Sequence, residues 1–458
     1  MTSVLLVYPY FKPRRDRSIF RFPPLGISYV AASLRKAGYP VRILDCTFTD
    51  RADALNEAVS RRPDVVGVYS MAGMQEDSLA FARRLRGKCQ LLVAGGPLPT
   101  CNPASFVNDF DVVVRGEGER ALVEVLAAHE SASSPDAISG IAFRGRNGRP
   151  EDNRDGEIVL TPPRQLEVGL DEIPFPARDL LPNQKYIDHL RRRFGQATTT
   201  VMTTRGCPFT CEYCSSAVFG VSYRERSPGN VIDEVEQALS LGYDRIHFAD
   251  DVFTLRKERV LRVCREIRAR GLHFKWECLG RVDSADRELL MEMKEAGCDR
   301  MFFGIESGNE QVLGLMRKRI SLESARVAVE TARSLGIRTG AFFILCYPGE
   351  TDRTVLNTIR FANSLPLDYL SFTRPYILAG TALYERVRSR PPGDGGAPGR
   401  RQFDRSLVFD AEFSRRKMEY AVMKGNAQFW LGKRLGRFAF LLARPFEIVT
   451  DAVFRLMK

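Results

Sequence analysis

Three cysteines stand close together in the middle of the chain, at Cys207, Cys211 and Cys214, in a CxxxCxxC spacing. Three thiolates on one loop can hold three corners of a cubane iron–sulfur cluster. A structural zinc site normally needs four protein ligands, and no further Cys or His lies nearby in the sequence. One metal corner would therefore stay open to a substrate or a cofactor. The alternatives are a zinc site completed by a distant residue such as His247, or thiols that bind no metal.

The cysteine loop follows a run that is typical of a buried strand, residues 199–203. Five more apolar runs of strand length follow, separated by helical patterns, at 245–250, 273–279, 300–307, 339–345 and 369–373. The first of these helices is predicted to begin at Ser227, a good N-cap, with Pro228 at its first position. Six βα units are two short of a closed barrel, so we expect a partial (β/α)6 barrel whose chemistry lies at the carboxyl ends of its strands.

The N-terminal part of the chain shows a similar alternation. Apolar runs at 4–8, 41–45, 65–70, 91–96 and 111–115 predict five buried parallel strands, with helical patterns such as 25–37 and 77–87 between them. Such βα units predict a doubly wound, Rossmann-like α/β domain, in which ligands lie beyond the carboxyl ends of the strands. Glycines gather at several of these ends, where they let the backbone approach a bulky ligand. The simpler alternative for any single glycine is that it only turns the chain from strand to helix.

The remaining segments connect or extend these two regions. A polar turn at 145–150 predicts a hairpin, and three prolines within 170–182 predict an extended linker. The segment 390–400 is rich in proline and glycine and predicts a flexible loop. The expected domains are a Rossmann-like domain at 1–135, a linker with a hairpin at 136–195, the partial barrel at 196–390, and a loop with a helical C-terminal region at 391–458.

The C-terminal tail, from Phe413 onward, is predicted to be helical, basic and amphipathic. Apolar residues such as Trp430 alternate there with basic residues such as Lys433 and Arg437. Packing of this tail on the barrel is the simpler explanation. Peripheral contact with an anionic membrane, or with a lipid substrate, is the alternative.

Composition narrows the class of protein. The chain has 458 residues, of which 44% are hydrophobic and 27% charged, which is an ordinary globular composition that argues against wholesale disorder. It contains no apolar run long enough to span a membrane, and its first residues suggest a buried strand, not a signal peptide. We therefore expect a cytoplasmic protein.

Charge and metal-binding residue types exclude further classes. Ten cysteines in a chain of this length are too few for a disulfide scaffold, and four separated histidines exclude a His-rich metal centre. The net charge of +12 is compatible with nucleic acid, an anionic membrane or an acidic substrate. Because the basic residues are spread along the chain, an arginine-rich surface without such a partner is the favoured interpretation, and we expect no nucleic acid partner.

The cysteine motif and its position after a strand resemble those of the radical S-adenosylmethionine (radical SAM) superfamily, whose signature is CxxxCxxC after the first strand of a partial (β/α)6 barrel. The resemblance implies that Cys207, Cys211 and Cys214 ligate a 4Fe–4S cluster. The open iron would chelate the amino and carboxylate groups of SAM, and one electron would cleave SAM to methionine and a 5′-deoxyadenosyl radical. The backbone of Tyr213, between the last two cysteines, would touch the adenine.

Other barrel segments carry the resemblance further. Asp250 and Asp251 stand where the family has a Gly-Gly-Glu segment, which implies carboxylates that bind the methionine ammonium. The alternative is that these acids cap the following helix. Arg281, at the end of the next strand, could pair with the SAM carboxylate.

Two later segments are also implied to bind SAM. Glu306 and Ser307 lie in a Gly-Ile-Glu-Ser-Gly segment, and Glu306 could bond the ribose or the amine of SAM. Pro348 and Gly349 lie in a Pro-Gly-Glu-Thr turn that resembles the family's turn near the adenine. Here Cys346 replaces the usual glycine, and a small core residue is the favoured interpretation of that thiol.

The N-terminal domain resembles the cobalamin-binding domain that precedes the barrel in one large subgroup of the superfamily. The resemblance implies that its strand ends bind cobalamin, through Ser70, Gly95, Gly96, Gly116, Glu117 and Gly118. The DxHxxG motif that supplies a cobalt ligand is absent, because Asp45 is followed by Cys46, Thr47 and Phe48, with no histidine. Members without a histidine ligand exist, so cobalamin is still expected; a degenerate domain that has lost cobalamin is the alternative.

The resemblance thus implies a cobalamin-dependent radical SAM methyltransferase. It would act through the 5′-deoxyadenosyl radical on an unactivated carbon of a small molecule or lipid, with electrons from an external reductase or a flavodoxin-type donor. No catalytic residue is assigned. One alternative is a non-methylating radical SAM enzyme, for cyclisation, ring rearrangement or sugar dehydration, with a modified or vestigial cobalamin domain. An alternative of another class is a metal-cluster binding module that does not cleave SAM.

Overall fold

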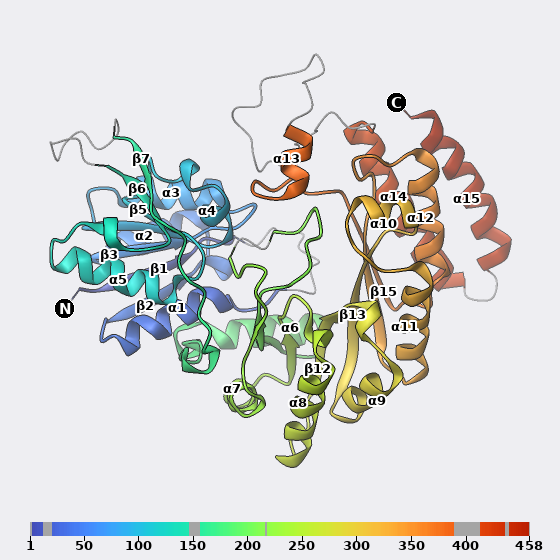
Figure 1. The fold of residues 1–458 in the computed structure, drawn as a ribbon, viewed down its shortest axis with the longest axis horizontal. Coiled ribbons are helices and arrows are strands. Elements are labelled where there is room, and N and C mark those ends of the chain that lie inside the picture. The colour runs from blue at the N-terminus through green and yellow to red at the C-terminus, as the bar shows by residue number, and fades with distance from the viewer. Residues whose placement is uncertain are drawn as a thin grey trace. The chain divides into compact units, whose positions relative to one another are not determined.

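The computed structural model describes residues 2–11, 21–145, 156–215, 218–388, 413–435 and 439–457 (Figure 1). They form two compact units. The first unit consists of residues 1–201 and 216–245, and the second of residues 202–215 and 246–458. The flexible loop predicted at 390–400 lies outside the described residues.

The first unit is built on a seven-stranded sheet in the order β2-β1-β3-β4-β5-β6-β7. Its first five strands are parallel, whereas β6 and β7 pair antiparallel at one edge. This confirms the Rossmann-like prediction. The antiparallel pairing of β6 with β7 is that of a hairpin, but the predicted turn lies outside the described residues from position 146 onward. The strands are β1 (Val4–Tyr8), β2 (Val41–Asp45), β3 (Val65–Tyr69), β4 (Leu91–Gly95), β5 (Val112–Val114), β6 (Ile141–Arg144) and β7 (Ile158–Leu160).

Helices cover both faces of this sheet. Val4 and Leu6 of β1 share one core with the helices α1 and α5, which lie side by side in Figure 1. Leu5 and Val7, which point to the opposite face, are buried as well. Burial on both faces explains why β1 is an uninterrupted apolar run. The helices are α1 (Leu25–Lys36), α2 (Arg51–Ser60), α3 (Gln75–Leu85), α4 (Pro97–Cys101), α5 (Gly118–Glu130) and α6 (Asn183–Phe194).

The first unit also includes β8 (Thr198–Val201), β10 (Arg224–Glu225) and α7 (Pro228–Ser240). As predicted, the side chain of Ser227 caps α7, by accepting a hydrogen bond from the backbone N of Asn230, and Pro228 opens the helix. Both features are local in sequence, which is why they could be read without a structure.

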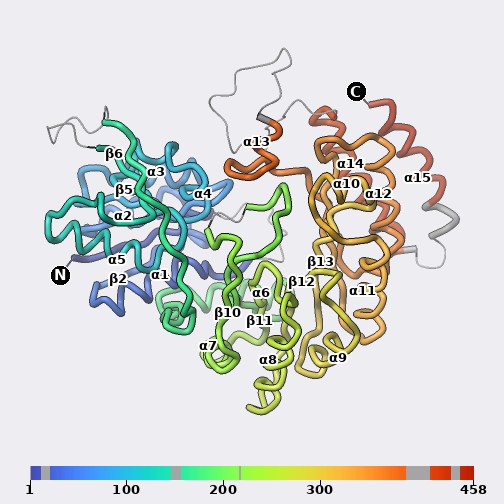
Figure 2. The backbone as a smooth tube through the Cα atoms, viewed as in Figure 1, coloured from blue at the N-terminus to red at the C-terminus, as the bar shows by residue number. Residues whose placement is uncertain are grey.

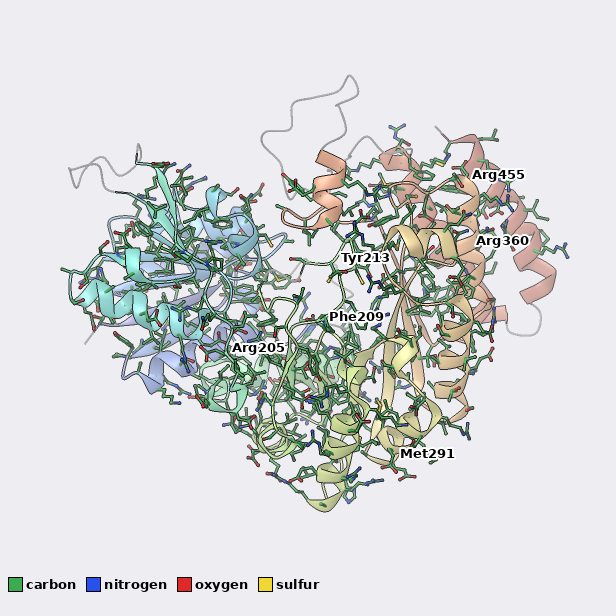
Figure 3. All side chains as sticks on the ribbon, viewed as in Figure 1. Arg205, Phe209, Tyr213, Met291, Arg360 and Arg455 are labelled. Atoms are coloured by element: carbon green, nitrogen blue, oxygen red, sulfur yellow. The ribbon has the colours of Figure 1, made fainter. Side chains whose placement is uncertain are left out.

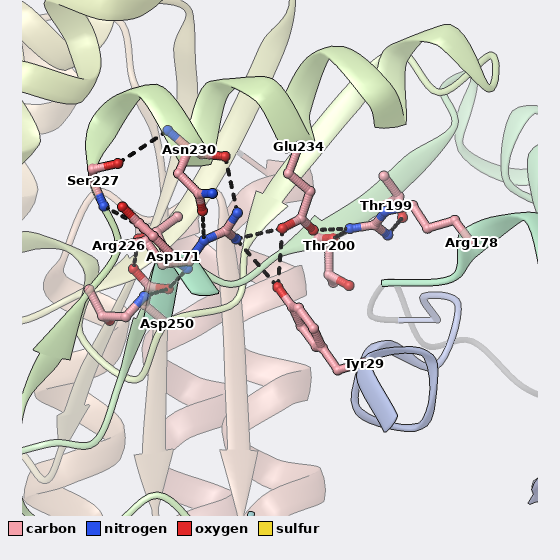
Figure 4. Close-up of polar contacts among 12 residues, drawn as sticks. Tyr29, Asp171, Arg178, Thr199, Thr200, Arg226, Ser227, Asn230, Glu234 and Asp250 are labelled. Atoms are coloured by element: carbon pink, nitrogen blue, oxygen red, sulfur yellow. Dashed lines mark hydrogen bonds and ion pairs between the residues drawn. The ribbon is translucent and has the colours of Figure 1, made fainter. Parts of the chain in front are cut away.

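A buried ion network joins α7 to two other parts of the first unit (Figure 4). Glu234 of α7 is fully buried and forms ion pairs with Arg178 and Arg226. Its carboxylate also accepts a hydrogen bond from Tyr29 of α1 at 3.1 Å. Arg178 donates to the carbonyl of Thr200 in β8 at 2.7 Å. The stretch 170–182, predicted to be an extended linker, therefore contains a buried anchor, and it includes two short 3-10 turns.

The second sheet has six strands in the order β15-β14-β13-β12-β11-β8. Strands β12 to β15 pair in parallel, with helices between them in sequence, as predicted for a partial barrel. The second unit contributes β9 (Thr204–Arg205), β11 (Arg245–Phe248), β12 (Lys275–Gly280), β13 (Cys298–Glu306), β14 (Arg338–Ile344) and β15 (Tyr369–Thr373). Figure 2 traces the backbone through these βα units.

The helices of the second unit are α8 (Lys257–Ala269), α9 (Arg287–Glu295), α10 (Glu310–Leu315), α11 (Leu322–Ser334), α12 (Asp352–Ser364), α13 (Ala382–Arg388), α14 (Arg415–Leu435) and α15 (Ala439–Leu456). The tail is helical as predicted, and it packs on the barrel, with α14 against β15 and α12 and with α15 against α12 and α14. None of the helices among the described residues is long and apolar enough to cross a membrane.

Candidate active site

The cysteine loop, residues 207–214, begins two residues after β9 and is anchored by the strand end next to it. Asp250 follows β11, and its carboxylate accepts hydrogen bonds from the backbone N of Thr203 at 2.6 Å and of Thr204 at 3.0 Å. Arg259 of α8 donates to the carbonyl of Thr203 at 3.1 Å. Asp250 and Arg259 are both buried. Together they fix the backbone from which the cysteine loop leaves the sheet.

The three cysteines are free thiols on this one loop. Cys207 and Cys211 are half-buried, whereas Cys214 is exposed. Burial raises the pKa of Cys207. The pKa of Cys214 is raised as well, because protein packs beside its thiol even though the residue is exposed as a whole. The Asp251 carboxylate and the neighbouring thiols add to both effects. The three sulfurs and Asp251 therefore lie in one electrostatic neighbourhood. A bound cationic metal reverses this effect, because a coordinating thiol is deprotonated outright.

The donor set suits a cluster better than a single ion. Among the described residues, no three His, Cys, Asp or Glu side chains converge closely enough to hold one metal ion. A cubane binds its cysteines on different irons, so their sulfurs need not converge on one point. Three thiols within an eight-residue loop fit that arrangement, and the single-zinc alternative fits less well.

Asp250 and Asp251 do not cap the following helices. The short 3-10 turn after them has Val252 at its N-cap, and α8 has Arg256, and neither cap position shows a side-chain hydrogen bond. The capping alternative is therefore wrong. Asp250 anchors the backbone before the cysteine loop, while the surrounding protein and the Asp250 charge raise the pKa of Asp251.

Glu212, inside the cysteine motif, joins the loop to two other segments, and the sequence analysis did not single it out. Its carboxylate accepts hydrogen bonds from the hydroxyl of Tyr347 at 2.6 Å and from Nε and Nη2 of Arg386 at 2.7 and 2.9 Å. Its backbone N donates to the carbonyl of Met316, and its own carbonyl accepts from the backbone N of Leu383. Burial disfavours its charge, but the bonds from Arg386 and Tyr347 outweigh burial and lower its pKa. Glu212 therefore acts as a clamp on the loop.

Tyr213 and Glu306, two predicted SAM-binding residues, are brought together by a lysine that the sequence analysis missed. Nζ of Lys318 donates to Glu306 at 3.1 Å and to the hydroxyl of Tyr213 at 3.3 Å. Glu306 has a left-handed backbone (φ of 73°) at an irregularity in β13. Gly304 makes room for this group, since a Cβ there would lie 2.6 Å from a Glu306 carboxylate oxygen. Burial and the Glu306 charge raise the pKa of Tyr213 well above its usual value.

Arg281, another of the predicted SAM-binding residues, contacts the cysteine loop. Its guanidinium lies over the ring of Phe209, at 3.7 Å from the ring centroid. Phe209 is a residue of the cysteine loop and is labelled in Figure 3. It also donates to Asp283 at 3.0 and 2.8 Å and to the carbonyls of Lys318 and Arg319. These contacts hold Arg281 in place beside the loop.

The predicted residues farther along the barrel differ in their surroundings. The fully buried hydroxyl of Ser307 shares a 3.0 Å hydrogen bond with Thr358, which is a packing role. Pro348 is buried and Gly349 is exposed, in the turn that precedes α12. Cys346 has a φ of 62°, the left-handed conformation that suits glycine, at the position where the family usually has glycine. Burial raises the pKa of the Cys346 thiol, so it is an unreactive core residue as interpreted.

In the first unit, the predicted cobalamin residues form a shelf at the strand ends. The Ser70 hydroxyl is fully buried and has no hydrogen-bond partner among the residues that the structure describes, while its backbone N donates to the carbonyl of Gly95 at 2.8 Å. Gly96 has a φ of 108°, and a Cβ there would lie 2.7 Å from the carbonyl of Ser70 and 3.0 Å from the ring of Tyr69. Glycine is therefore required at position 96 by the packing of the protein itself. The unsatisfied Ser70 hydroxyl is the group at this strand end that a polar ligand would satisfy.

At the end of β5, the predicted cobalamin residue Glu117 is already bound by other residues of the protein. Gly118 is the first residue of α5, and Gly116 has a left-handed backbone. The buried Glu117 carboxylate accepts hydrogen bonds from Arg224 at 2.8 Å and from the backbone N of Glu167 at 3.1 Å. Glu117 therefore positions segments of the first unit.

The segment that lacks the usual cobalt ligand is built around Asp45. Its carboxylate accepts from the backbone N and hydroxyl of Thr47 at 3.0 and 2.6 Å and from the hydroxyl of Tyr186 at 2.7 Å. Cys46 is fully buried, and burial raises its pKa. Neither side chain is disposed as a metal ligand, so cobalamin held here would have no ligand from this segment.

Comparison with known proteins decides the family. The profile described as radical SAM superfamily matches residues 201–362, and the B12-binding domain profile matches residues 16–126. An uncharacterized methyltransferase of Pyrococcus horikoshii is 34% identical over 396 residues, which cover 84% of this chain and 82% of the relative. The chain belongs to the radical SAM superfamily, with an N-terminal B12-binding domain.

Other relatives of this radical SAM protein differ in their reactions. The hopanoid C-3 methylase of Methylococcus capsulatus is 33% identical over 373 residues, covering 78% of this chain and 67% of the relative. An anaerobic magnesium-protoporphyrin IX monomethyl ester cyclase of Cereibacter sphaeroides is 28% identical, covering 84% and 64%. The fold matches that of the cobalamin-dependent SAM radical enzyme OxsB with a TM-score of 0.77 at 16% identity, over 99% of this chain and 72% of that one.

The protein is thus a cobalamin-dependent radical SAM enzyme, and its cofactors are a 4Fe–4S cluster, SAM and cobalamin. Because the chain belongs to the radical SAM superfamily, we reject the alternative of a cluster-binding module that does not cleave SAM. The residues present fit these cofactors, with three thiols on one loop for the cluster and, for cobalamin, the shelf around Ser70.

Proposed function

We propose that the protein is a C-methyltransferase that acts on an unactivated carbon of an apolar small molecule or lipid. The observation that carries the proposal is the combination, in one chain, of a three-cysteine loop at a strand end with a B12-binding domain. Two of its relatives, the Pyrococcus protein and the hopanoid methylase, are named as methyltransferases. The hopanoid relative also supports an apolar substrate.

In this proposal the chain's own residues bind and position the cofactors. Cys207, Cys211 and Cys214 hold the cluster. Asp250 and Glu212 hold the loop that carries them, and each does so through hydrogen bonds to residues far away in sequence. The cluster with SAM would supply radical chemistry at the cysteine loop, and cobalamin would supply methyl-transfer chemistry.

SAM is proposed to contact the residues around the loop. Four of these residues have side chains next to the cysteine loop or on it: Tyr213, Asp251, Arg281 and Glu306. The turn that contains Pro348 and Gly349 is linked to the loop by the hydrogen bond between Tyr347 and Glu212. Ser307 supports these residues from within the core, through the hydrogen bond that it shares with Thr358. Cobalamin is proposed to contact Ser70, Gly95, Gly96, Gly116 and Gly118, with Glu117 as support. Electrons come from an external reductase or a flavodoxin-type donor.

The test is anaerobic turnover with SAM that carries a deuterated methyl group. Protein reconstituted with iron, sulfide and cobalamin is incubated with a reductant and with lipid and small-molecule extracts of the source cells, and the products are analysed by mass spectrometry. We expect 5′-deoxyadenosine and a product that carries the labelled methyl group. The Cys211→Ala variant should give neither. Formation of 5′-deoxyadenosine with substrate consumption but no labelled product would contradict the methyltransferase proposal.

Ring closure is the second candidate function, because a relative that matches over 84% of this chain is named as a cyclase. The same experiment separates the two functions. A cyclase would yield 5′-deoxyadenosine and a product that has lost hydrogen, without any label from the methyl group of SAM.

A further inference from the structure

The last helix, α15, exposes apolar side chains and directs its acidic side chains toward the protein. Surface helices normally bury their apolar face and expose their charged one. In α15 the side chains of Ile448, Val449, Val453 and Leu456 are exposed by 62%, 62%, 41% and 83%. These positions fall within a single arc of about 140° at 100° per residue. We call this set of four residues the outer face of α15.

The acids of α15 point the other way. Glu447 and Asp451, which are its only acidic residues, both form ion pairs with Arg360 of α12, and Asp451 also pairs with Lys424 of α14 at 2.7 Å. Figure 3 labels Arg360 on α12. Phe454, on the same inner side, is fully buried. The helix is therefore held by charge pairs on its inner side, and its outer face is left apolar.

Two arginines border the outer face. Arg444 lies four residues before Ile448, and Arg455 lies seven residues after it, so both fall along the edge of the face that Ile448 marks. Both are exposed, and Figure 3 labels Arg455 on α15. Since both acids of the helix are already paired inward, the outer face and its border carry positive charge only.

We propose that the outer face of α15 binds an anionic membrane surface, with its apolar side chains in the lipid interface and Arg444 and Arg455 on the headgroups. Its 18 residues span about 27 Å along the surface, and the helix lies on the bilayer and does not cross it. A second copy of the chain fits less well, because a two-fold interface would bring Arg444 and Arg455 of two molecules together without an acid between them. The proposal does not rest on the reaction that the enzyme catalyses.

The test is co-sedimentation of the full-length protein with vesicles of phosphatidylcholine, alone or mixed with phosphatidylglycerol. We expect binding to the mixed vesicles that weakens as salt is added. Arg455→Gln should lower the partition coefficient about five-fold, the equivalent of about 1 kcal/mol for one cation near an anionic surface. Val449→Glu should lower it about ten-fold or more, because a charge replaces an inserted apolar side chain.

The matched control is Val327→Glu on α11, since Val327 is 52% exposed but lies outside the outer face of α15. This variant should bind vesicles as the unmodified chain does, and circular dichroism should show all three variants folded. Equal loss of binding in Val327→Glu and Val449→Glu would overturn the proposal. So would equal binding to both kinds of vesicle, or a dimer in solution that Val449→Glu dissociates.

Discussion

The clamp formed by Glu212 gives the sharpest prediction about the cysteine loop. The Glu212 carboxylate accepts two hydrogen bonds from Arg386 and one from Tyr347. Glu212→Gln keeps the shape of the side chain but removes its negative charge. A hydrogen bond to a charged group contributes about 1.5–3 kcal/mol. Because the Arg386 side chain is 29% exposed, solvent screens part of this energy. We therefore expect a cost of about 2 kcal/mol to loop docking, which is about a 30-fold increase in the undocked population.

The assay is the iron and sulfide content of the reconstituted protein, measured together with urea unfolding. Glu212→Gln should lower cluster retention after gel filtration, and Arg386→Gln should have a similar effect. The double variant should cost little more than either single variant, because both remove the same ion pair. Glu323→Gln, an exposed acid in the first turn of α11, is the matched control and should behave as the unmodified protein.

The pH dependence of the clamp has a definite sign. The pKa of Glu212 is lowered in the folded protein from its ordinary value of 4.5. The clamp therefore contributes its full stability above that value and loses it as pH falls through the lowered pKa. Cluster retention that is the same in Glu212→Gln as in the unmodified protein at neutral pH, or additive losses in the double variant, would refute the reasoning.

Three further predictions concern groups away from the clamp. Glu234→Ala removes the buried carboxylate that forms ion pairs with Arg178 and Arg226, so it should destabilise the protein by about 3–5 kcal/mol in urea unfolding; a loss under about 1 kcal/mol would contradict the buried network. Ser70→Ala should fold normally but retain less cobalamin, measured by absorbance after desalting, and unchanged retention would exclude that hydroxyl from the cobalamin site. Gly304→Ala should displace the Glu306 carboxylate and raise the KM for SAM in a 5′-deoxyadenosine assay, whereas an unchanged KM would exclude that carboxylate from SAM binding.

Features that are local in sequence were predictable. The motif of Cys207, Cys211 and Cys214 occupies eight consecutive residues, and the cap of α7 at Ser227 involves neighbours only. Strands such as β1 are readable because burial on both faces leaves an unbroken apolar run. These signals were enough to give the fold class and the family.

The partners of charged residues were not predictable, since they come from distant segments. Asp250 meets Thr203 across 47 positions, and Glu212 meets Arg386 across 174. Lys318, which bonds Glu306, follows α10 and stands in no recognisable motif. A single sequence shows that such side chains are charged, but only the packing of the strands and loops shows which charges meet.

The central claim is that one iron of the cluster is left for SAM. The most direct measurement is the electron paramagnetic resonance spectrum of the reduced, reconstituted protein, recorded with and without SAM. We expect a 4Fe–4S signal that changes shape when SAM is added and that disappears in Cys207→Ala. A signal that is indifferent to SAM, in protein with a full complement of iron, would mean that a protein side chain fills the remaining position and would contradict the account.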